Sequence, residues 1–112
     1  MNENTYELLE MMLTYSNRAV SYCNEISSLQ EFLVDLKTQD AVMMLFLSIG
    51  ELVNRLPDNY IEQHPRINWR GMVGLRNIAA HGYHRVIPET IWEIIQNSLP
   101  DLVSFLQEQL GK

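Results

Sequence analysis

The sequence contains a single cysteine, Cys23, so no intramolecular disulfide can form and nothing indicates an oxidising compartment. This cysteine falls in a helical pattern, where the expected role is that of a small buried apolar residue. Basic residues are also scarce, eight against fourteen acidic ones, for a formal net charge of −6. The charge balance argues against a broad basic surface that wraps nucleic acid non-specifically, although it leaves room for a small positive cleft.

Long hydrophobic runs are missing as well. The longest, "AVMMLFLSIG", is far shorter than the roughly 20 residues that a membrane span needs. The first residues, "MNENTYELLE", lack the basic-then-apolar order of a signal peptide. We therefore expect a cytoplasmic protein that does not enter membranes. The 112 residues suit one domain, residues 1–112, with an ordinary hydrophobic fraction of 46%.

Strand patterns are absent, and apolar residues recur instead at three- and four-residue steps, which is typical of amphipathic helices. The stretch 42–49 is apolar almost all round and is the expected centre of the core. Residues 56–65, "LPDNYIEQHP", carry two prolines and are predicted to be a loop. The fold class is therefore all-α, an up-and-down bundle of four or five helices. The predicted helices cover residues 6–26, 28–37, 38–56, 68–81 and 88–110.

Polar residues, glycine and proline mark the expected ends of these helices. Asn4 or Thr5 is a candidate N-cap for the first helix, and Thr38 for the third. Gly82 suits the left-handed backbone at the end of the fourth helix. Pro100 interrupts the last helix, but the apolar phase resumes after it, so a kink is expected rather than a break.

A polar cluster, "RNIAAHGYHR", occupies residues 76–85 and raises the question of a catalytic site. Taken one by one, these residues have ordinary interpretations: Arg76 as a surface ion-pair residue, His81 as a helix cap and Tyr83 as an aromatic at the core edge. The other two histidines are His64, expected to be solvated in a loop, and His84, which with its neighbour arginine adds local positive charge. The three histidines lack a ligand spacing that indicates a metal site.

Taken together, "RNIAAHGY" resembles the R-x4-H-x-Y signature of HepT-like toxins, within the HEPN group of helical domains. Trp69 upstream and "ETIWEIIQNSLPDLVSFL" downstream are also similar to that family, so the resemblance covers nearly the whole chain. The family's members are helical bundles, in agreement with the pattern of this sequence. The tryptophans Trp69 and Trp92 are interpreted as core anchors.

The resemblance implies cleavage of RNA without a metal or other cofactor. In that reaction the 2′-hydroxyl of a ribose attacks the adjacent phosphate, leaving a 2′,3′-cyclic phosphate and a free 5′-hydroxyl. His81 is the matching group for proton transfer, because an imidazole exchanges a proton near neutral pH. Arg76 matches the fixed positive charge on the phosphate. Asn77 could bond the phosphate or orient His81.

The resemblance also implies a partner and a regulatory site. HepT-like toxins are paired with a minimal nucleotidyltransferase antitoxin, which transfers AMP from ATP onto the motif tyrosine, here Tyr83. Nucleotides on Tyr83 would add negative charge and bulk beside Arg76 and His81. A larger hetero-oligomer of toxin and antitoxin is compatible with this relationship.

Helix geometry alone does not bring the two catalytic candidates together. Arg76 and His81 are five residues apart, roughly 140° around a regular helix, whereas Asn77 and His81 share a face. Two such helices facing each other across a two-fold axis would combine two arginines with two histidines, and HEPN proteins are similar in dimerising this way. We therefore expect a homodimer. Small residues would permit a close approach of helices there: Gly71, Gly74, Ala79 and Ala80.

Two other functional classes remain open on the sequence. Related HEPN domains resemble binding modules that hold a nucleotide or partner a nucleotidyltransferase without turnover, and Arg76 would then bind a phosphate only. A purely structural helical adaptor is the third class. That class predicts that substitutions of Arg76, His81 or Tyr83 change nothing beyond stability.

Overall fold

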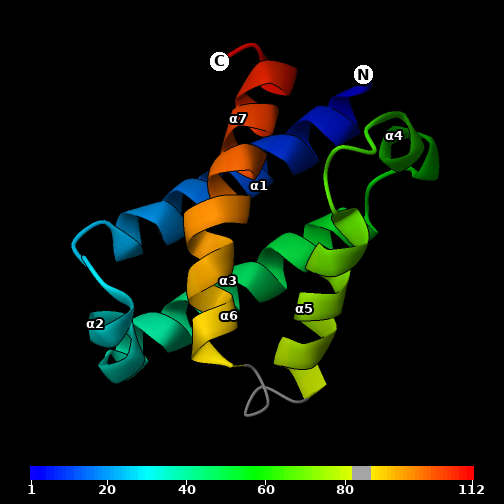
Figure 1. Ribbon diagram of the computed structural model, residues 1–112. Coiled ribbons are helices and arrows are strands. Elements are labelled where there is room, and N and C mark those ends of the chain that lie inside the picture. Colours follow the sequence, from blue (N-terminus) through cyan, green and yellow to red (C-terminus); the bar gives the residue numbers. More distant parts are fainter. Residues whose placement is uncertain (82–86) are drawn as a thin grey trace.

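The computed structural model describes residues 1–81 and 87–112, and all regular structure in these two ranges is helical (Figure 1). The predicted all-α bundle is confirmed. The predicted end of the fourth helix at Gly82 lies outside the described residues. The helices are α1 (Glu3–Cys23), α2 (Leu29–Val34), α3 (Leu36–Asn54), α4 (Asp58–Gln63), α5 (Trp69–His81), α6 (Pro88–Glu93), the π-helical η2 (Ile94–Ser98) and α7 (Leu99–Leu110).

Four long helical rods form the bundle. The helices α1 and α3 pack against each other, and α6, η2 and α7 follow one another without interruption as a single rod that crosses α1 (Figure 1). The helix α5 packs mainly on α3, so it stands at one side of the bundle (Figure 1). None of the described helices combines the length and the apolar character that a membrane crossing requires.

The core is centred on α3, as predicted from the apolar run. Five residues of the stretch 42–49 are buried, in the helix that packs against both α1 and α5. Two further residues are half-buried, and Met44 has 62% of its surface exposed, so the stretch is not buried all round. The buried residues of this stretch are Val42, Met43, Leu45, Phe46 and Ile49.

The caps of two helices lie earlier than the sequence indicated. The N-cap of α1 is Asn2, rather than Asn4 or Thr5, and its side chain accepts a hydrogen bond from the Thr5 amide at 2.7 Å. Asp35 caps α3 by accepting from the amide of Thr38 at 3.0 Å and from its hydroxyl at 2.7 Å. These two hydrogen bonds hold the pKa of Asp35 below its usual range. The cap at Asp35 also ends the predicted helix 28–37 early, at Val34.

The segment 56–65 is not the plain loop that its prolines suggested, because it contains α4. His64, predicted to be solvated, packs its ring against Tyr60 with centroids 4.2 Å apart and against Phe105 at 5.4 Å. The His64 Nδ1 atom lies 2.8 Å from the Tyr60 carbonyl oxygen. The short helix α4 lets the His64 ring pack between the rings of Tyr60 and Phe105. A solvated loop would leave these rings exposed.

The last rod accommodates Pro100 through a π-helical turn in the five residues before α7. Proline has no amide hydrogen and cannot donate to a carbonyl one turn earlier. The amide of Leu99 bonds instead to the Ile94 carbonyl, five residues back, which is the π-helical spacing. The apolar phase then continues through α7, as predicted.

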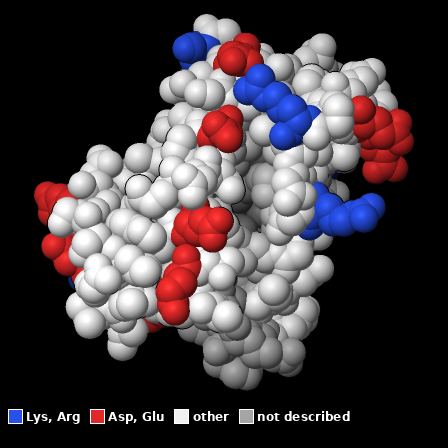
Figure 2. Space-filling model, viewed as in Figure 1, with Lys and Arg blue, Asp and Glu red and all other residues white. Residues whose placement is uncertain are grey.

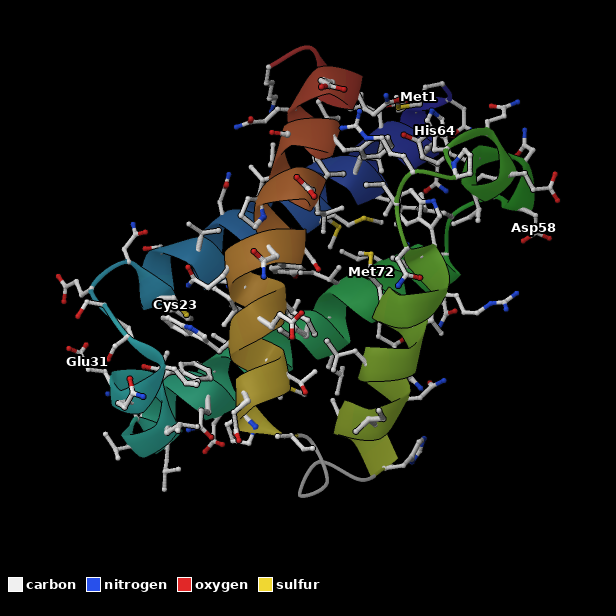
Figure 3. All side chains as sticks on the ribbon, viewed as in Figure 1. Met1, Cys23, Glu31, Asp58, His64 and Met72 are labelled. Carbon is white, nitrogen blue, oxygen red and sulfur yellow. The ribbon has the colours of Figure 1, made fainter. Side chains whose placement is uncertain are left out.

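Three single-residue interpretations of the sequence are confirmed. Cys23 is buried (Figure 3), and burial, with a smaller contribution from Asp35, raises the pKa of its thiol, so the reactive thiolate is disfavoured. Trp69 is 5% exposed and anchors the start of α5. Trp92 is half-buried and rests on Phe32, with ring centroids 5.2 Å apart.

Candidate active site

The helix α5 carries the described part of the polar cluster, and its start is firmly anchored. The Asn68 side chain accepts a hydrogen bond from the Gly71 amide at 3.0 Å, which is the geometry of an N-cap. The Trp69 indole donates to the His64 carbonyl oxygen at 2.9 Å. The predicted bounds of this helix, from Asn68 or Trp69 to His81, are confirmed. The helix therefore presents its last two turns in a fixed direction.

Gly50 allows α5 to approach α3 closely beside this cluster. A Cβ atom at position 50 would lie 2.9 Å from the Met72 carbonyl oxygen and 3.0 Å from the Arg76 Cγ atom, and it would overlap the Arg76 Cβ atom. Real Cβ atoms do not come this near to a backbone oxygen. The stem of Arg76 therefore crosses α3 at the point where α3 has no side chain.

The Arg76 guanidinium is held on two sides by acceptors from two helices. Its Nε and Nη2 atoms both contact the Oε1 atom of Glu51 on α3, in a charge-assisted hydrogen bond and ion pair. Its Nη1 atom donates to the Asn77 side-chain oxygen at 2.9 Å. The Arg76 side chain is 26% exposed. A guanidinium has five N–H bonds, so one on each terminal nitrogen stays available for a further acceptor.

Asn77 occupies the exposed surface of α5, next to Arg76 along the chain. The sequence suggested that this side chain bonds a phosphate or orients His81. In the structure its carbonyl oxygen is engaged by Arg76, and its amide nitrogen is left for other acceptors. Asn77 therefore contacts one of the two candidates directly.

His81 is the last residue of α5, and its side chain is exposed. Because α5 stays helical through His81, the side chains of Arg76 and His81 leave the axis roughly 140° apart. Arg76 lies on the side that faces α3, whereas His81 lies on the side that faces away. Among residues 1–81 and 87–112, no hydrogen bond or ion pair joins His81 to another side chain. The two candidates do not contact each other within one chain.

Tyr83 lies outside the described residues, as do Gly82, His84 and Arg85. The same part of the chain that the structure describes holds no group of three His, Cys, Asp or Glu side chains placed to bind a metal ion. The described site therefore consists of a fixed arginine, an asparagine that contacts it, and an exposed histidine one turn further along α5.

An apolar pocket of about 190 Å³ lies elsewhere, between α5, α3 and the last rod. Figure 2 shows the surface hollowed between α7 and α5, and Met72 points into the gap between them (Figure 3). Most of its lining is apolar, and the polar groups at its edge include Arg66 and Asp101. Neither Arg76 nor His81 lines it, so the pocket is separate from the polar cluster and is poorly suited to a phosphate.

Comparison with known proteins shows the family to which this chain belongs. The sequence pattern of the family described as "Ribonuclease HepT-like" matches residues 12–109. The chain belongs to the HepT-like ribonuclease family. The match includes α3, α5 and the last rod, so both elements that hold Arg76 are family elements in this chain. The resemblance drawn from "RNIAAHGY" is confirmed.

Curated relatives of this HepT-like protein carry ribonuclease names. "Putative RNase MJ0127" of Methanocaldococcus jannaschii is 35% identical over 103 residues, covering 92% of this chain and 81% of the relative. "Probable ribonuclease HepT" of Thermococcus cleftensis is 34% identical over 73 residues, covering 65% and 66%. "Putative RNase TTE0752" of Caldanaerobacter subterraneus is 32% identical over 85 residues, covering 76% of each. No solved structure matches the chain significantly.

Two residues of the HepT-like site were missed by reasoning from the sequence. Glu51 lies 25 residues before Arg76, and no local pattern pairs them. The available signal was that Glu51 is the first charged residue after Asp40, directly after the apolar stretch of this helix. Gly50 was missed because it lies in an apolar stretch far from the polar cluster. Of the small residues predicted to allow a close helix approach, Gly74 has no neighbour within 4 Å of a Cβ atom built on it.

Proposed function

We propose that this chain is a metal-independent RNA endonuclease, the toxin of a toxin–antitoxin pair that acts in the cytoplasm. In this proposal Arg76 binds the reacting phosphate, Asn77 supports Arg76, and His81 transfers protons. Membership of the HepT-like ribonuclease family supports the substrate class. The observation that supports the site assignment is the Arg76 guanidinium, held by Glu51 and Asn77, with two N–H bonds that no other described residue accepts.

The chemistry follows from what these groups offer. The 2′-oxygen of a ribose attacks the adjacent phosphorus, the bond from phosphorus to the 5′-oxygen breaks, and a 2′,3′-cyclic phosphate forms. The 2′-hydroxyl gives up a proton to an imidazole, and the 5′-oxygen receives one from an imidazole. The paired N–H bonds of Arg76 stabilise the charge that grows on the phosphate oxygens in the transition state. His81 is the group assigned to proton transfer.

The reaction needs more than one copy of α5. Since Arg76 and His81 leave one helix on different sides, we propose a homodimer in which the exposed faces of two α5 helices meet. The two His81 side chains would then lie on the shared face, one to accept a proton and one to donate. Each Arg76 would reach the phosphate with its terminal N–H bonds from the edge of that face. The exposed side of α5 offers room for this, because Gly71 is exposed and a Cβ atom on Gly74 would meet nothing within 4 Å.

Tyr83 is the proposed point of control. It follows His81 by two residues, so a nucleotide on its hydroxyl would place phosphate beside the catalytic pair. Such a phosphate would compete with RNA for Arg76 and repel the substrate backbone. The proposed modifying partner is a nucleotidyltransferase antitoxin that transfers AMP from ATP to Tyr83 with release of pyrophosphate, and that binds the toxin in a hetero-oligomer.

Purified protein incubated with end-labelled RNA in EDTA tests the proposed function. We expect internal cleavage with 2′,3′-cyclic phosphate and 5′-hydroxyl ends, because the 2′-oxygen is the nucleophile and the reaction uses no metal. The chemical nature of the new ends is identified by testing whether phosphatase removes a phosphate from the products and whether polynucleotide kinase adds one. A 2′-O-methyl version of the same RNA is the control and should remain intact.

Other outcomes of this experiment distinguish the alternatives. Binding of the RNA without cleavage, before and after adding Mg²⁺, would identify a HEPN-type binding module. Cleavage with 5′-phosphate ends would contradict the proposed chemistry. If the protein neither binds nor cleaves the RNA, the structural adaptor is the class that remains.

Intact mass of the protein, co-expressed with a nucleotidyltransferase encoded beside it, tests the control of activity. We expect added mass in multiples of one adenylyl group and loss of RNA cleavage. Tyr83→Phe should remove the added mass, because no hydroxyl remains to accept AMP. An adenylyl group that persists on Tyr83→Phe would place the modification at another residue, with Tyr15 and Tyr22 as the first to examine.

A further inference from the structure

The carboxylate of Glu51 selects which part of the Arg76 guanidinium is available to a ligand. Glu51 lies on α3 and Arg76 on α5, and the single oxygen Oε1 contacts both Nε and Nη2. These contacts occupy the side edge of the guanidinium. Asn77 occupies one N–H bond of Nη1. One N–H bond on each terminal nitrogen then remains without a partner among the described residues.

A pair of parallel N–H bonds at the end of a guanidinium matches two oxygens of one phosphate. An unrestrained arginine has many rotamers, and ordering it on binding costs conformational entropy. Here the ordering is already in place, because Gly50 lets the stem lie against α3 and Glu51 fixes the head. We propose that Glu51 is a positioning residue for RNA cleavage, which aims the terminal N–H pair of Arg76 at the reacting phosphate. This inference rests on the proposed function.

The same contact has an opposite interpretation, which the experiment separates. A carboxylate beside an arginine neutralises it, so Glu51 could also mask Arg76 from an anionic substrate. The described contacts favour positioning, because Glu51 engages the inner edge and leaves the outer pair free. The Glu51 side chain is 46% exposed, so water screens much of its charge toward a ligand on the outer edge. Positioning predicts lower activity on removal of Glu51, and masking predicts higher activity.

The test compares Glu51→Ala and Glu51→Gln with the wild-type protein in single-turnover and multiple-turnover RNA cleavage. We expect Glu51→Ala to lower kcat by about 30-fold with a smaller change in KM, because a misaimed group costs most in the transition state. Glu51→Gln should retain more activity, since its amide oxygen still accepts from Arg76. In an Arg76→Ala background, Glu51→Ala should add almost no further loss.

The matched control is Glu108→Gln, which removes the same charge from an exposed ion pair with Arg66 at 3.4 Å. It should keep wild-type kcat. Higher activity in Glu51→Ala, or an equal loss in the Arg76→Ala background, would overturn the inference. Glu51→Ala could also lower both kcat and the melting temperature, and do so equally whether or not Arg76 is present. That result would overturn the inference too, because Glu51 would then act on the fold.

A second readout separates this inference from the proposed function. Should the wild-type protein not cut RNA, the proposed nuclease fails, and binding of the 2′-O-methyl RNA still tests Glu51. Glu51→Ala should then weaken binding by about tenfold in the wild-type background and not in Arg76→Ala. The Arg76 Nε–H signal in nitrogen-15 NMR should be slow to exchange in wild type and lost in Glu51→Ala. An unchanged signal together with unchanged binding would reject the positioning role.

Discussion

Replacement of His81 by alanine is expected to abolish RNA cleavage, with a loss in kcat/KM of at least about 10³-fold. The reason is that alanine can neither accept a proton from the 2′-hydroxyl nor donate one to the 5′-oxygen. The fold should persist, because His81 is exposed at the last residue of α5 and makes no hydrogen bond or ion pair with a described side chain. Gel-based cleavage of labelled RNA measures the loss, and circular dichroism measures the helix content and the melting temperature.

The control for His81→Ala is Asn54→Ala, which changes an exposed polar residue at the last position of α3. It should cleave at the wild-type rate and melt within about 2 °C of the wild type, as surface changes usually do. Growth of cells that express each variant gives an independent measure of toxicity. Arrest by His81→Ala at wild-type protein levels would remove His81 from the mechanism.

Arg76→Lys is expected to lose about 10²-fold in kcat/KM, although the formal charge is unchanged. One guanidinium contacts Glu51 through two nitrogens, contacts Asn77 through the third and still has a terminal N–H pair free. An ammonium is a single point with three donors, so it cannot reach both acceptors and grip two phosphate oxygens. Arg76→Ala should lose about tenfold more, since no charge remains.

Arg70→Lys is the matched control, because Arg70 lies on the same helix, is exposed and belongs to the first turn rather than the last two. Its cleavage rate should equal that of the wild type. Full activity of Arg76→Lys would mean that the reaction needs only a positive charge near the phosphate. That result would also remove the reason for a fixed guanidinium.

The sequence predicted the helical frame well because that frame depends on local rules. Apolar spacing gave the bounds of α5 within a residue, and its cap and final turn follow from residues beside them. The cap of α3 was misplaced because Asp35 and Thr38 both suit such a position, and only the backbone angles of Asp35 decide between them. The helix α4 was missed because two prolines obscured a six-residue pattern.

The site was predictable only where its residues are neighbours along the chain. Arg76, Asn77 and His81 share one helix, and their order along the chain carried the family resemblance that implied phosphate binding and proton transfer. Glu51 belongs to another helix, so its contact with Arg76 depends on how α3 and α5 cross. That crossing depends in turn on Gly50, whose missing side chain leaves no periodic signal. The resemblance therefore indicated the candidate groups, whereas the contacts that hold Arg76 follow only from the structure.

Gly50 ties the position of Arg76 to the spacing of the core helices. The helices α3 and α5 can approach this closely because residue 50 has only a hydrogen atom as its side chain. A larger side chain there would push Arg76, and α5 with it, away from α3. Anyone who transplants the arginine and histidine onto a different helical scaffold would need to carry over the neighbouring helix and its bare position too. The smallest transferable unit is thus a crossed pair of helices rather than a ten-residue motif.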